Sequence, residues 1–197
     1  MRYVLNEKII SMNVKEVFTM PNCREWIIDI DSDARDKKVL NLQNNICIQT
    51  FILFFKDVHY KMYTSGNRGL HIWLDVDDFS PTATNEERSH YANLFNKNHI
   101  NISKYNVQND NSFYKCFTDA LQSDIIIPHL YEYMKSLNNV TNQSQHLIDV
   151  FFPKIDFGVF TSTKRGCRVP LSYNQKGCKF GVEIITKSQR NRVIDIL

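Results

Sequence analysis

The chain has 197 residues, of which 43% are apolar and 23% charged, and its formal net charge is +3. This length suggests one domain, or one domain with a small appendage, and the apolar share is enough for a buried core. Because the five cysteines are isolated, no apolar run could span a membrane and no signal peptide is recognisable, we expect reduced thiols in a nuclear or cytoplasmic protein, not secreted or membrane-bound.

The charge is unevenly distributed. Residues 1–150 hold 15 Lys/Arg against 18 Asp/Glu, whereas residues 151–197 hold nine against three. A basic C-terminal quarter favours a polyanionic partner such as a nucleotide or nucleic acid. A solvated charged chain end explains the same composition, and composition alone leaves both explanations open.

The first informative segment is a predicted strand from Trp26 to Asp31. Alternation places Trp26, Ile28 and Ile30 on one face and two carboxylates, Asp29 and Asp31, on the other. The two carboxylates leave the backbone about 6.6 Å apart, which suits oxygen ligands converging on one or two Mg²⁺ ions. The alternative is a strand running into a solvated acidic turn, and that is the more common explanation of an isolated D-x-D pattern.

Three elements follow, and the last two form a predicted hairpin. The apolar positions of residues 39–56 indicate a buried helix, and alternation predicts strands over residues 60–64 and 70–76. The two glycines between the strands indicate a tight turn.

The turn reads S-G-N-R-G-L-H from Ser65 to His71. It offers a hydroxyl, backbone N–H groups at Gly66 and Gly69, the Arg68 guanidinium and an imidazole, all of which suit phosphate oxygens. Each residue alone is more often structural. Their combination within seven residues, downstream of an acidic strand, indicates a phosphate-binding turn.

Further helices are expected beyond the hairpin. Thr84 and Glu87 form a capping box that predicts a helix from Asn85 to about Lys97. Its expected apolar face consists of Tyr91, Leu94 and Phe95. Helices are also predicted over residues 112–121 and from Pro128 to about residue 137, with polar links at 98–110 and 138–145. We interpret their aromatic side chains as core.

The last third of the chain contains a predicted third strand over residues 147–156, which ends on Asp156. Pro153 indicates a bend or an edge position in that strand. A loop rich in cations and turn residues follows over residues 161–177. A closing strand over residues 180–185 and a basic tail complete the chain.

Three blocks of sequence together resemble the archaeo-eukaryotic primases. They are Asp29-Ile-Asp31, then S-G-N-R-G-L-H-I-W from Ser65 to Trp73, then P-K-I-D ending on Asp156 with R-V-P-L-S from Arg168 behind it. The resemblance covers roughly residues 24–182 and is greatest to the catalytic small subunit of replicative primase. The short length and the absence of zinc-ligand cysteines resemble the viral branch, found in baculoviruses and nudiviruses.

The resemblance implies roles for the matching positions. The catalytic and metal-binding set, holding two Mg²⁺ or Mn²⁺ ions, would be Asp29, Asp31 and Asp156. The nucleotide-binding set would be Ser65, Gly66, Arg68, Gly69, His71, Arg168 and Lys176. No zinc is expected, because the structural zinc ligands of cellular small subunits are missing. The chain departs from the family at Asn67, where a second arginine is common, and at Asn174, the nearest equivalent of a histidine.

The expected fold is α+β, with two packed β-sheet units (one RRM-like) forming a cleft and with flanking helices, in a single catalytic domain spanning residues 1–197. The expected function is that of a DNA primase catalytic subunit, which makes short RNA primers on a single-stranded DNA template from nucleoside triphosphates. A second primase subunit or accessory replication factor is an expected partner, and a membrane is not. The alternatives are a repair-type polymerase of the same superfamily and a non-catalytic nucleic-acid-binding replication scaffold.

Overall fold

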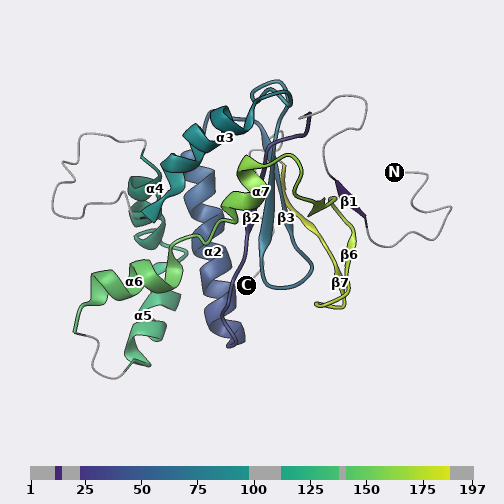
Figure 1. Cartoon of the computed structure of the whole chain (residues 1–197). Helices are drawn as coiled ribbons and strands as arrows, with labels where there is room; N and C mark the ends of the chain where they lie inside the picture. The colour runs from purple at the N-terminus through teal and green to yellow at the C-terminus, as the bar shows by residue number, and fades with distance from the viewer. Residues whose placement is uncertain (1–11, 15–22, 98–111, 138–140, 187–197) are drawn as a thin grey trace. The chain divides into compact units, whose positions relative to one another are not determined.

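The computed structural model describes residues 12–14, 23–97, 112–137 and 141–186 (Figure 1). The chain divides into two compact units whose segments alternate along the sequence. The first, which we call the sheet unit, consists of Met1–Asp31, Val58–Ala92 and Ile155–Leu197. The second, the helical unit, consists of Ser32–Asp57 and Asn93–Lys154.

The sheet unit is built on a four-stranded antiparallel sheet with strand order β2-β4-β3-β8. These strands are β2 (Ile27–Ile30), β3 (Tyr60–Thr64), β4 (Leu70–Leu74) and β8 (Glu183–Thr186). Two smaller antiparallel pairs are β1 (Asn13–Val14) with β5 (Cys167–Arg168), and β6 (Tyr173–Asn174) with β7 (Lys179–Phe180). The first predicted strand and the predicted β3–β4 hairpin are confirmed, and the closing strand is divided between β7 and β8.

The alternation of β2 and β4 separates an apolar face from a face that carries polar groups. Ile28 of β2 is paired with Ile72 of β4, and Ile72 in turn with Met62 of β3; all three side chains are fully buried. On the opposite face Ile27 packs with Val159 and Cys167. Because Ile27 and Asp29 are two residues apart, the strand presents the carboxylate on this second face.

Helix α3 (Asn85–Ala92) begins with the predicted capping box. The backbone N–H of Thr84 donates to Glu87, and the N–H of Glu87 donates to the Thr84 hydroxyl. The helix is shorter than predicted, since residues Asn93–Phe95 form a 3₁₀ turn, η1.

The predicted apolar face is confirmed at Phe95, which is 4% exposed, and is wrong at its other two positions. Tyr91 is 46% and Leu94 56% exposed, and the buried side chains of α3 are those of Arg88 and Ala92. Arg88 lies 4.7 Å above the ring of Trp26, and its guanidinium donates to the carbonyl oxygen of Arg24. Carbonyl oxygens accept from the Nε and Nη2 atoms of Arg88, whereas its buried Nη1 atom has no hydrogen-bond partner among the described residues. A cation covered by an aromatic ring therefore lies on the buried side of α3, where only apolar residues were expected.

The predicted strand over residues 147–156 is also wrong, because this segment contains helix α6 (Gln143–Phe151). Asn142 caps the helix by accepting a hydrogen bond from the N–H of Gln145, and Ile148 and Phe151 are buried one helical turn apart. The only extended pairing recorded for the segment is an isolated antiparallel bridge between Ile155 and Ile30.

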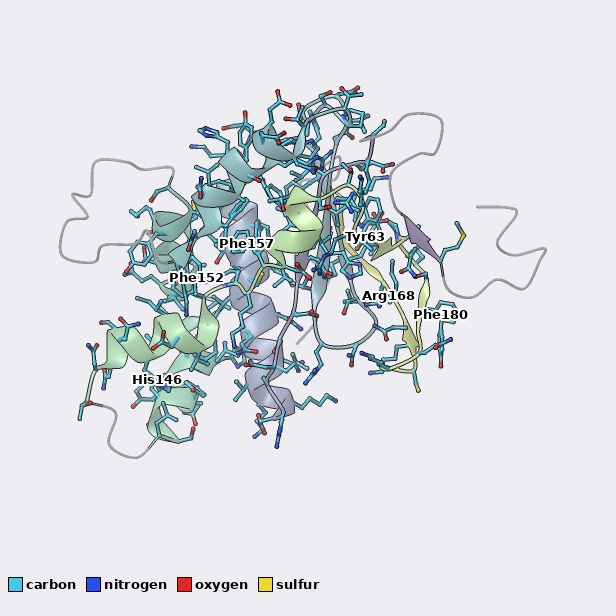
Figure 2. All side chains as sticks on the ribbon, in the orientation of Figure 1. Tyr63, His146, Phe152, Phe157, Arg168 and Phe180 are labelled. Carbon is cyan, nitrogen blue, oxygen red and sulfur yellow. The ribbon has the colours of Figure 1, made fainter. Side chains whose placement is uncertain are left out.

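The helical unit also contains α2 (Lys37–Phe54), α4 (Phe113–Leu121) and α5 (Ile127–Lys135), which confirm the predicted helices. Pro128 lies in the first turn of α5, where its missing N–H costs no helical hydrogen bond. The ring of Phe113 lies 5.0–5.6 Å, between centroids, from four others, so these phenylalanines form core as expected, whereas Tyr131 of α5 is 59% exposed and does not. The four other rings are those of Phe51, Phe54, Phe95 and Phe152, the last of which is labelled in Figure 2.

The mixture of helices and antiparallel sheets confirms the predicted fold class, whereas the RRM-like unit and the cleft stay predictions. The predicted link over residues 98–110 and the basic tail lie outside the described residues. Within the described part, no helix has the length and apolar character needed to cross a membrane.

Candidate active site

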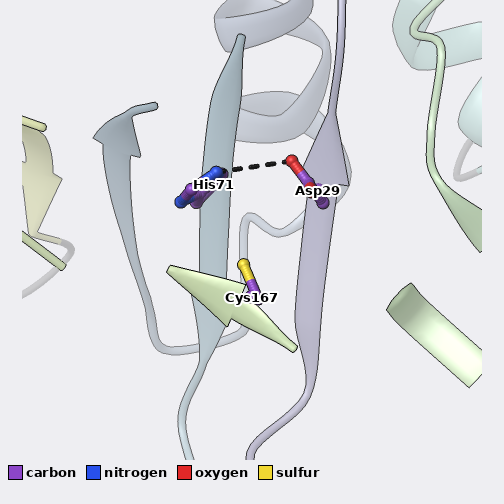
Figure 3. Close-up of side chains that lie close together, drawn as sticks. All are labelled: Asp29, His71 and Cys167. Carbon is purple, nitrogen blue, oxygen red and sulfur yellow. Dashed lines mark ion pairs between the residues drawn. The ribbon is translucent and has the colours of Figure 1, made fainter. Parts of the chain in front are cut away.

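The site begins with the pairing of β2 and β4, which places Asp29 directly opposite His71. The Nε2 atom of His71 lies 3.4 Å from the Oδ1 atom of Asp29 (Figure 3). The His71 side chain is 4% exposed and that of Asp29 is 19% exposed. Two elements that the sequence identified separately, the acidic strand and the phosphate turn, therefore meet at adjacent strand positions.

Burial and neighbouring charges shift the pKa of both groups. Burial raises the pKa of Asp29 to about 7, the negative charges of Asp31 and Asp156 add to this, and Arg168 opposes it. Burial, with Arg168 beside it, lowers the pKa of His71 to about 4. At neutral pH His71 is therefore uncharged, and the Asp29 carboxyl is poised between its protonated and ionised forms.

A hydrogen bond between backbone groups holds Asp156 beside Asp29. The Asp156 N–H donates to the Asp29 carbonyl oxygen at 2.8 Å, next to the bridge between Ile30 and Ile155. Asp156 also caps the short helix α7 (Phe157–Thr161), since its Oδ1 atom accepts from the N–H of Val159 at 3.1 Å. Its Oδ2 atom lies 4.0 Å from Arg165, so this second oxygen faces a side chain that is largely exposed.

Asp31 follows the end of β2 and is exposed. Its charge nevertheless acts on Asp29, as does that of Asp156. The structure thus brings the three predicted aspartates into one electrostatic cluster, and their catalytic and metal-binding roles stay predictions.

The turn between β3 and β4 is organised by Ser65. Its hydroxyl oxygen accepts from the N–H of Gly69 at 3.0 Å and from that of Asn67 at 3.4 Å. Gly66 has a positive φ of 74°, and a Cβ at Gly69 would lie 2.0 Å from the carbonyl oxygen of Ile30. Both glycines are therefore required for the turn to pass close to the end of β2.

Asn174 connects this turn to the basic loop. Its buried side chain donates to the Ser65 carbonyl at 2.9 Å and accepts from the N–H groups of Lys176 and Gly177. Asn174 therefore holds the turn and the basic loop together. The Lys176 and Arg68 side chains are exposed, which leaves both available to a ligand.

Arg168, labelled in Figure 2, lies on β5 and is partly buried. Its Nε atom is buried without a hydrogen-bond partner, and its charge acts on both Asp29 and His71. Of the predicted nucleotide-binding cations, Arg168 is therefore the one whose charge lowers the pKa of Asp29.

Two residues near the site were missed by sequence reasoning. Cys167 projects from β5 toward His71 and Asp29, and one ligand atom from each of the three residues lies within 4.8 Å of the others (Figure 3). Arg24, 1% exposed, donates to the carbonyl oxygens of Val159 and Arg165 and so positions α7 behind Asp156. For Cys167 the sequence signal was its position directly before the predicted site residue Arg168. No sequence pattern pointed to Arg24.

The donor set fits a divalent cation. The Oδ1 atom of Asp29 and the Nε2 atom of His71 are buried, and among the described residues neither has a hydrogen-bond partner, so two polar atoms are left unsatisfied. Asp31 and Asp156 add carboxylate oxygens of the kind that hard cations prefer. An acidic cluster with the Arg168 cation beside it combines oxygens that suit a divalent cation with a group that suits phosphate.

Comparison with known proteins identifies the class. The sequence pattern of the DNA primase small subunit family matches residues 28–186, and the chain belongs to this family. It is 32% identical over 189 residues to a DNA primase of Autographa californica nuclear polyhedrosis virus, an alignment that covers 94% of this chain and 65% of the relative. It is 29% identical over 196 residues to Late expression factor 1 of Orgyia pseudotsugata multicapsid polyhedrosis virus, with coverages of 97% and 72%.

The chain therefore spans slightly less than two thirds of the first relative's length and nearly three quarters of the second's. The expected membership of the primase family, and the similarity to its baculovirus branch, are confirmed.

Proposed function

We propose that this chain is the catalytic subunit of a viral DNA primase, a DNA-directed RNA polymerase that makes short RNA primers on single-stranded DNA. Membership of the primase small subunit family supports this proposal. The observation that carries it is the buried carboxylate of Asp29, which faces His71 and has the charges of Asp31 and Asp156 beside it. The two compact units are proposed to work as one catalytic domain.

Asp29, Asp31 and Asp156 are the residues that would hold two Mg²⁺ or Mn²⁺ ions. When bound, such ions activate a 3′-hydroxyl and stabilise the departing pyrophosphate. The chain's own contribution is to keep three carboxylates close together. The bond from Asp156 N–H to the Asp29 carbonyl and the helix cap at Val159 both restrict where the third carboxylate lies.

The incoming nucleoside triphosphate is proposed to lie against the turn and the basic loop. The cationic contacts fall to Arg68, Arg168 and Lys176, because the lowered pKa of His71 leaves its imidazole neutral at pH 7. His71 then acts as a hydrogen-bonding group. Ser65 accepts two backbone N–H groups, and its hydroxyl proton remains to donate to a phosphate oxygen.

A second primase subunit or an accessory replication factor is proposed as a partner on the template. A net charge of +3 gives only a weak non-specific hold on DNA, which supports the need for such a partner. The site of action is proposed to be the host nucleus or the cytoplasm.

A priming assay tests this function. Purified chain is mixed with single-stranded circular DNA and labelled ribonucleotides in Mg²⁺, in Mn²⁺ or in chelator, with and without candidate partners. Metal-dependent synthesis of short RNA without a pre-existing 3′-hydroxyl is expected. Extension of an annealed primer alone would favour the repair-type polymerase. Template binding without incorporation would favour the replication scaffold.

A further inference from the structure

We propose that Asp29, His71 and Cys167 form a site for one soft divalent cation, Zn²⁺ or Cd²⁺. Occupation of this site would inhibit the enzyme by withdrawing Asp29 from Mg²⁺. The binding part concerns only these three residues, whereas the inhibition part rests on the proposed primase function.

The geometry of the three donors is close to that of a tetrahedral site. One oxygen, one nitrogen and one sulfur atom all lie within 4.8 Å of one another, and the oxygen and nitrogen are 3.4 Å apart. Bonds of about 2.0–2.3 Å at tetrahedral angles place ligand atoms roughly 3.5 Å apart. The carboxylate and imidazole are already at this spacing, so the approach of Cys167 by about 1 Å completes a three-ligand set with an open fourth position.

The burial of these groups is the second observation. His71 is 3% exposed and Cys167 is 3% exposed. Within the described part of the chain the His71 Nε2 and Asp29 Oδ1 atoms have no hydrogen-bond partner, and the Cys167 thiol makes a long contact of 3.7 Å to the carbonyl oxygen of Arg168. Unsatisfied buried polar atoms are uncommon, and a cation bound between them would satisfy both.

The donor types determine which cation fits. A thiolate and an imidazole favour Zn²⁺ and Cd²⁺, whereas Mg²⁺ prefers six oxygen ligands. The thiol proton is released to the buffer when the metal binds. Among the neighbouring charges, Arg168 opposes a cation, and Asp31 and Asp156 attract one. A cation at this site would bind reversibly and inhibit. It is therefore distinct from the structural zinc of cellular small subunits, whose ligands this chain lacks.

Cadmium titration of the purified chain tests the binding part. The ultraviolet sulfur-to-cadmium charge-transfer band is expected to saturate at one equivalent. Loss of an outer-sphere partner weakens metal sites by 10- to 100-fold, so Cys167→Ser, which loses a direct ligand, should bind at least about 100-fold more weakly. The controls are Cys178→Ser, an exposed thiol, and Cys116→Ser, a buried thiol in the helical unit, and both should bind as the wild type does. Equal affinity in Cys167→Ser would overturn the site.

A second measurement uses the unmodified chain, so its result stands even if the Cys167→Ser variant fails to fold. The ¹¹³Cd NMR shift of the bound ion should report one sulfur ligand together with nitrogen and oxygen ligands. A shift characteristic of oxygen ligands alone would overturn the assignment.

Zinc inhibition tests the functional part. In a Mg²⁺-supported priming assay Cys167→Ser should keep the basal activity and should need at least about 100-fold more Zn²⁺ for half inhibition. Equal sensitivity of the two proteins would overturn the inhibitory role. If the wild type made no primers, the proposed function would fail, whereas the cadmium result would still decide whether the site exists.

Discussion

The sheet unit and the helical unit differ in whether their buried polar side-chain atoms have hydrogen-bond partners. Seven buried side-chain nitrogen or oxygen atoms in the described chain have no hydrogen-bond partner, and all lie in the sheet unit. They belong to Arg24, Asp29, His71, Trp73, Arg88, Arg168 and Ser172. Among its described residues the helical unit has none, and its core is a cluster of phenylalanine rings.

This difference indicates that the helical unit contributes mainly to stability, whereas the sheet unit carries the candidate site. A core of stacked and edge-to-face rings stabilises the helical unit, and no buried side-chain nitrogen or oxygen of its described residues is left without a partner. The sheet unit keeps a partly buried carboxylate with two others beside it, which is unfavourable in the metal-free protein. Residues that hold ligands are expected to destabilise the free protein. Mutations in the two units should therefore have different signatures.

The largest expected effect is on activity, from Asp31→Asn. Asp31 is exposed, so the fold and the free energy of unfolding in chelator should be unchanged or slightly improved. Primer synthesis should fall on the order of 1,000-fold, because an amide is a poor ligand for a hard cation and metal positioning lowers the barrier by several kcal/mol. Nucleotide incorporation and thermal melts in chelator measure the two parts. The matched control is Asp57→Asn, an exposed carboxylate in the helical unit, and normal synthesis by Asp31→Asn would remove Asp31 from the site.

In the helical unit the expected effect is on stability. Phe113 is 2% exposed and contacts four other rings, so Phe113→Ala should lower the free energy of unfolding by about 3–5 kcal/mol. Tyr131→Ala, at a position that is 59% exposed, should change it by less than about 0.5 kcal/mol. Urea denaturation measures both. A loss below about 1 kcal/mol in Phe113→Ala would contradict the division of labour between the units.

Arg68→Ala should weaken nucleotide binding without changing stability. The side chain is exposed, and a charge-assisted contact to phosphate is worth about 1.5–3 kcal/mol, so affinity should fall roughly tenfold to a hundredfold. Equilibrium binding of a labelled nucleoside triphosphate measures this, with Lys61→Ala, an exposed cation on the same hairpin, as control. Unchanged affinity would assign Arg68 to the turn alone.

The smallest expected effect is a gain in stability, from Asp29→Asn in chelator. Because the pKa of Asp29 is raised to about 7 in the folded protein, ionisation of this carboxyl destabilises the fold above pH 7. The variant should be more stable than the wild type by about 1–3 kcal/mol at pH 8, and the advantage should shrink as pH falls from 7 toward 4.

Urea denaturation at pH 8 and pH 5 measures this difference. His71, whose pKa is lowered to about 4, stabilises the fold above pH 6.5 and loses that contribution as pH falls to 4. Both proteins carry His71, so the difference between them isolates Asp29. An advantage that stays constant with pH would contradict the charge explanation.

Local patterns in the sequence predicted the elements that carry the site. Alternation identified β2, β3 and β4, the capping box identified the start of α3, and the turn sequence identified the segment held by Ser65. The sequence did not predict that β2 pairs with β4 and places Asp29 opposite His71. Strand pairing depends on contacts between distant segments, which the spacing of residues within one segment does not specify.

The errors have specific physical causes. Residues 147–156 form a short apolar run that suits either a helix or a strand, and the deciding signal was the cap at Asn142. Arg88 is buried on α3 because carbonyl oxygens accept from two of its three guanidinium nitrogens and the Trp26 ring covers it, and apolar spacing does not reveal such contacts. Cys167 and Arg24 act across the fold; Arg24 and the Val159 carbonyl to which it donates are 135 residues apart in sequence.

The hydrogen bond from the Asp156 N–H to the Asp29 carbonyl oxygen affects the order in which the site forms while the ribosome makes the chain. A chain emerging from the ribosome presents the first two aspartates early, and all of the helical unit precedes the third. Local helical contacts form quickly, whereas pairing of distant segments is slow. The helical unit is therefore able to fold while the carboxylate cluster is still incomplete. On the proposed function, the carboxylate site would be complete only when Asp156 pairs with the end of β2.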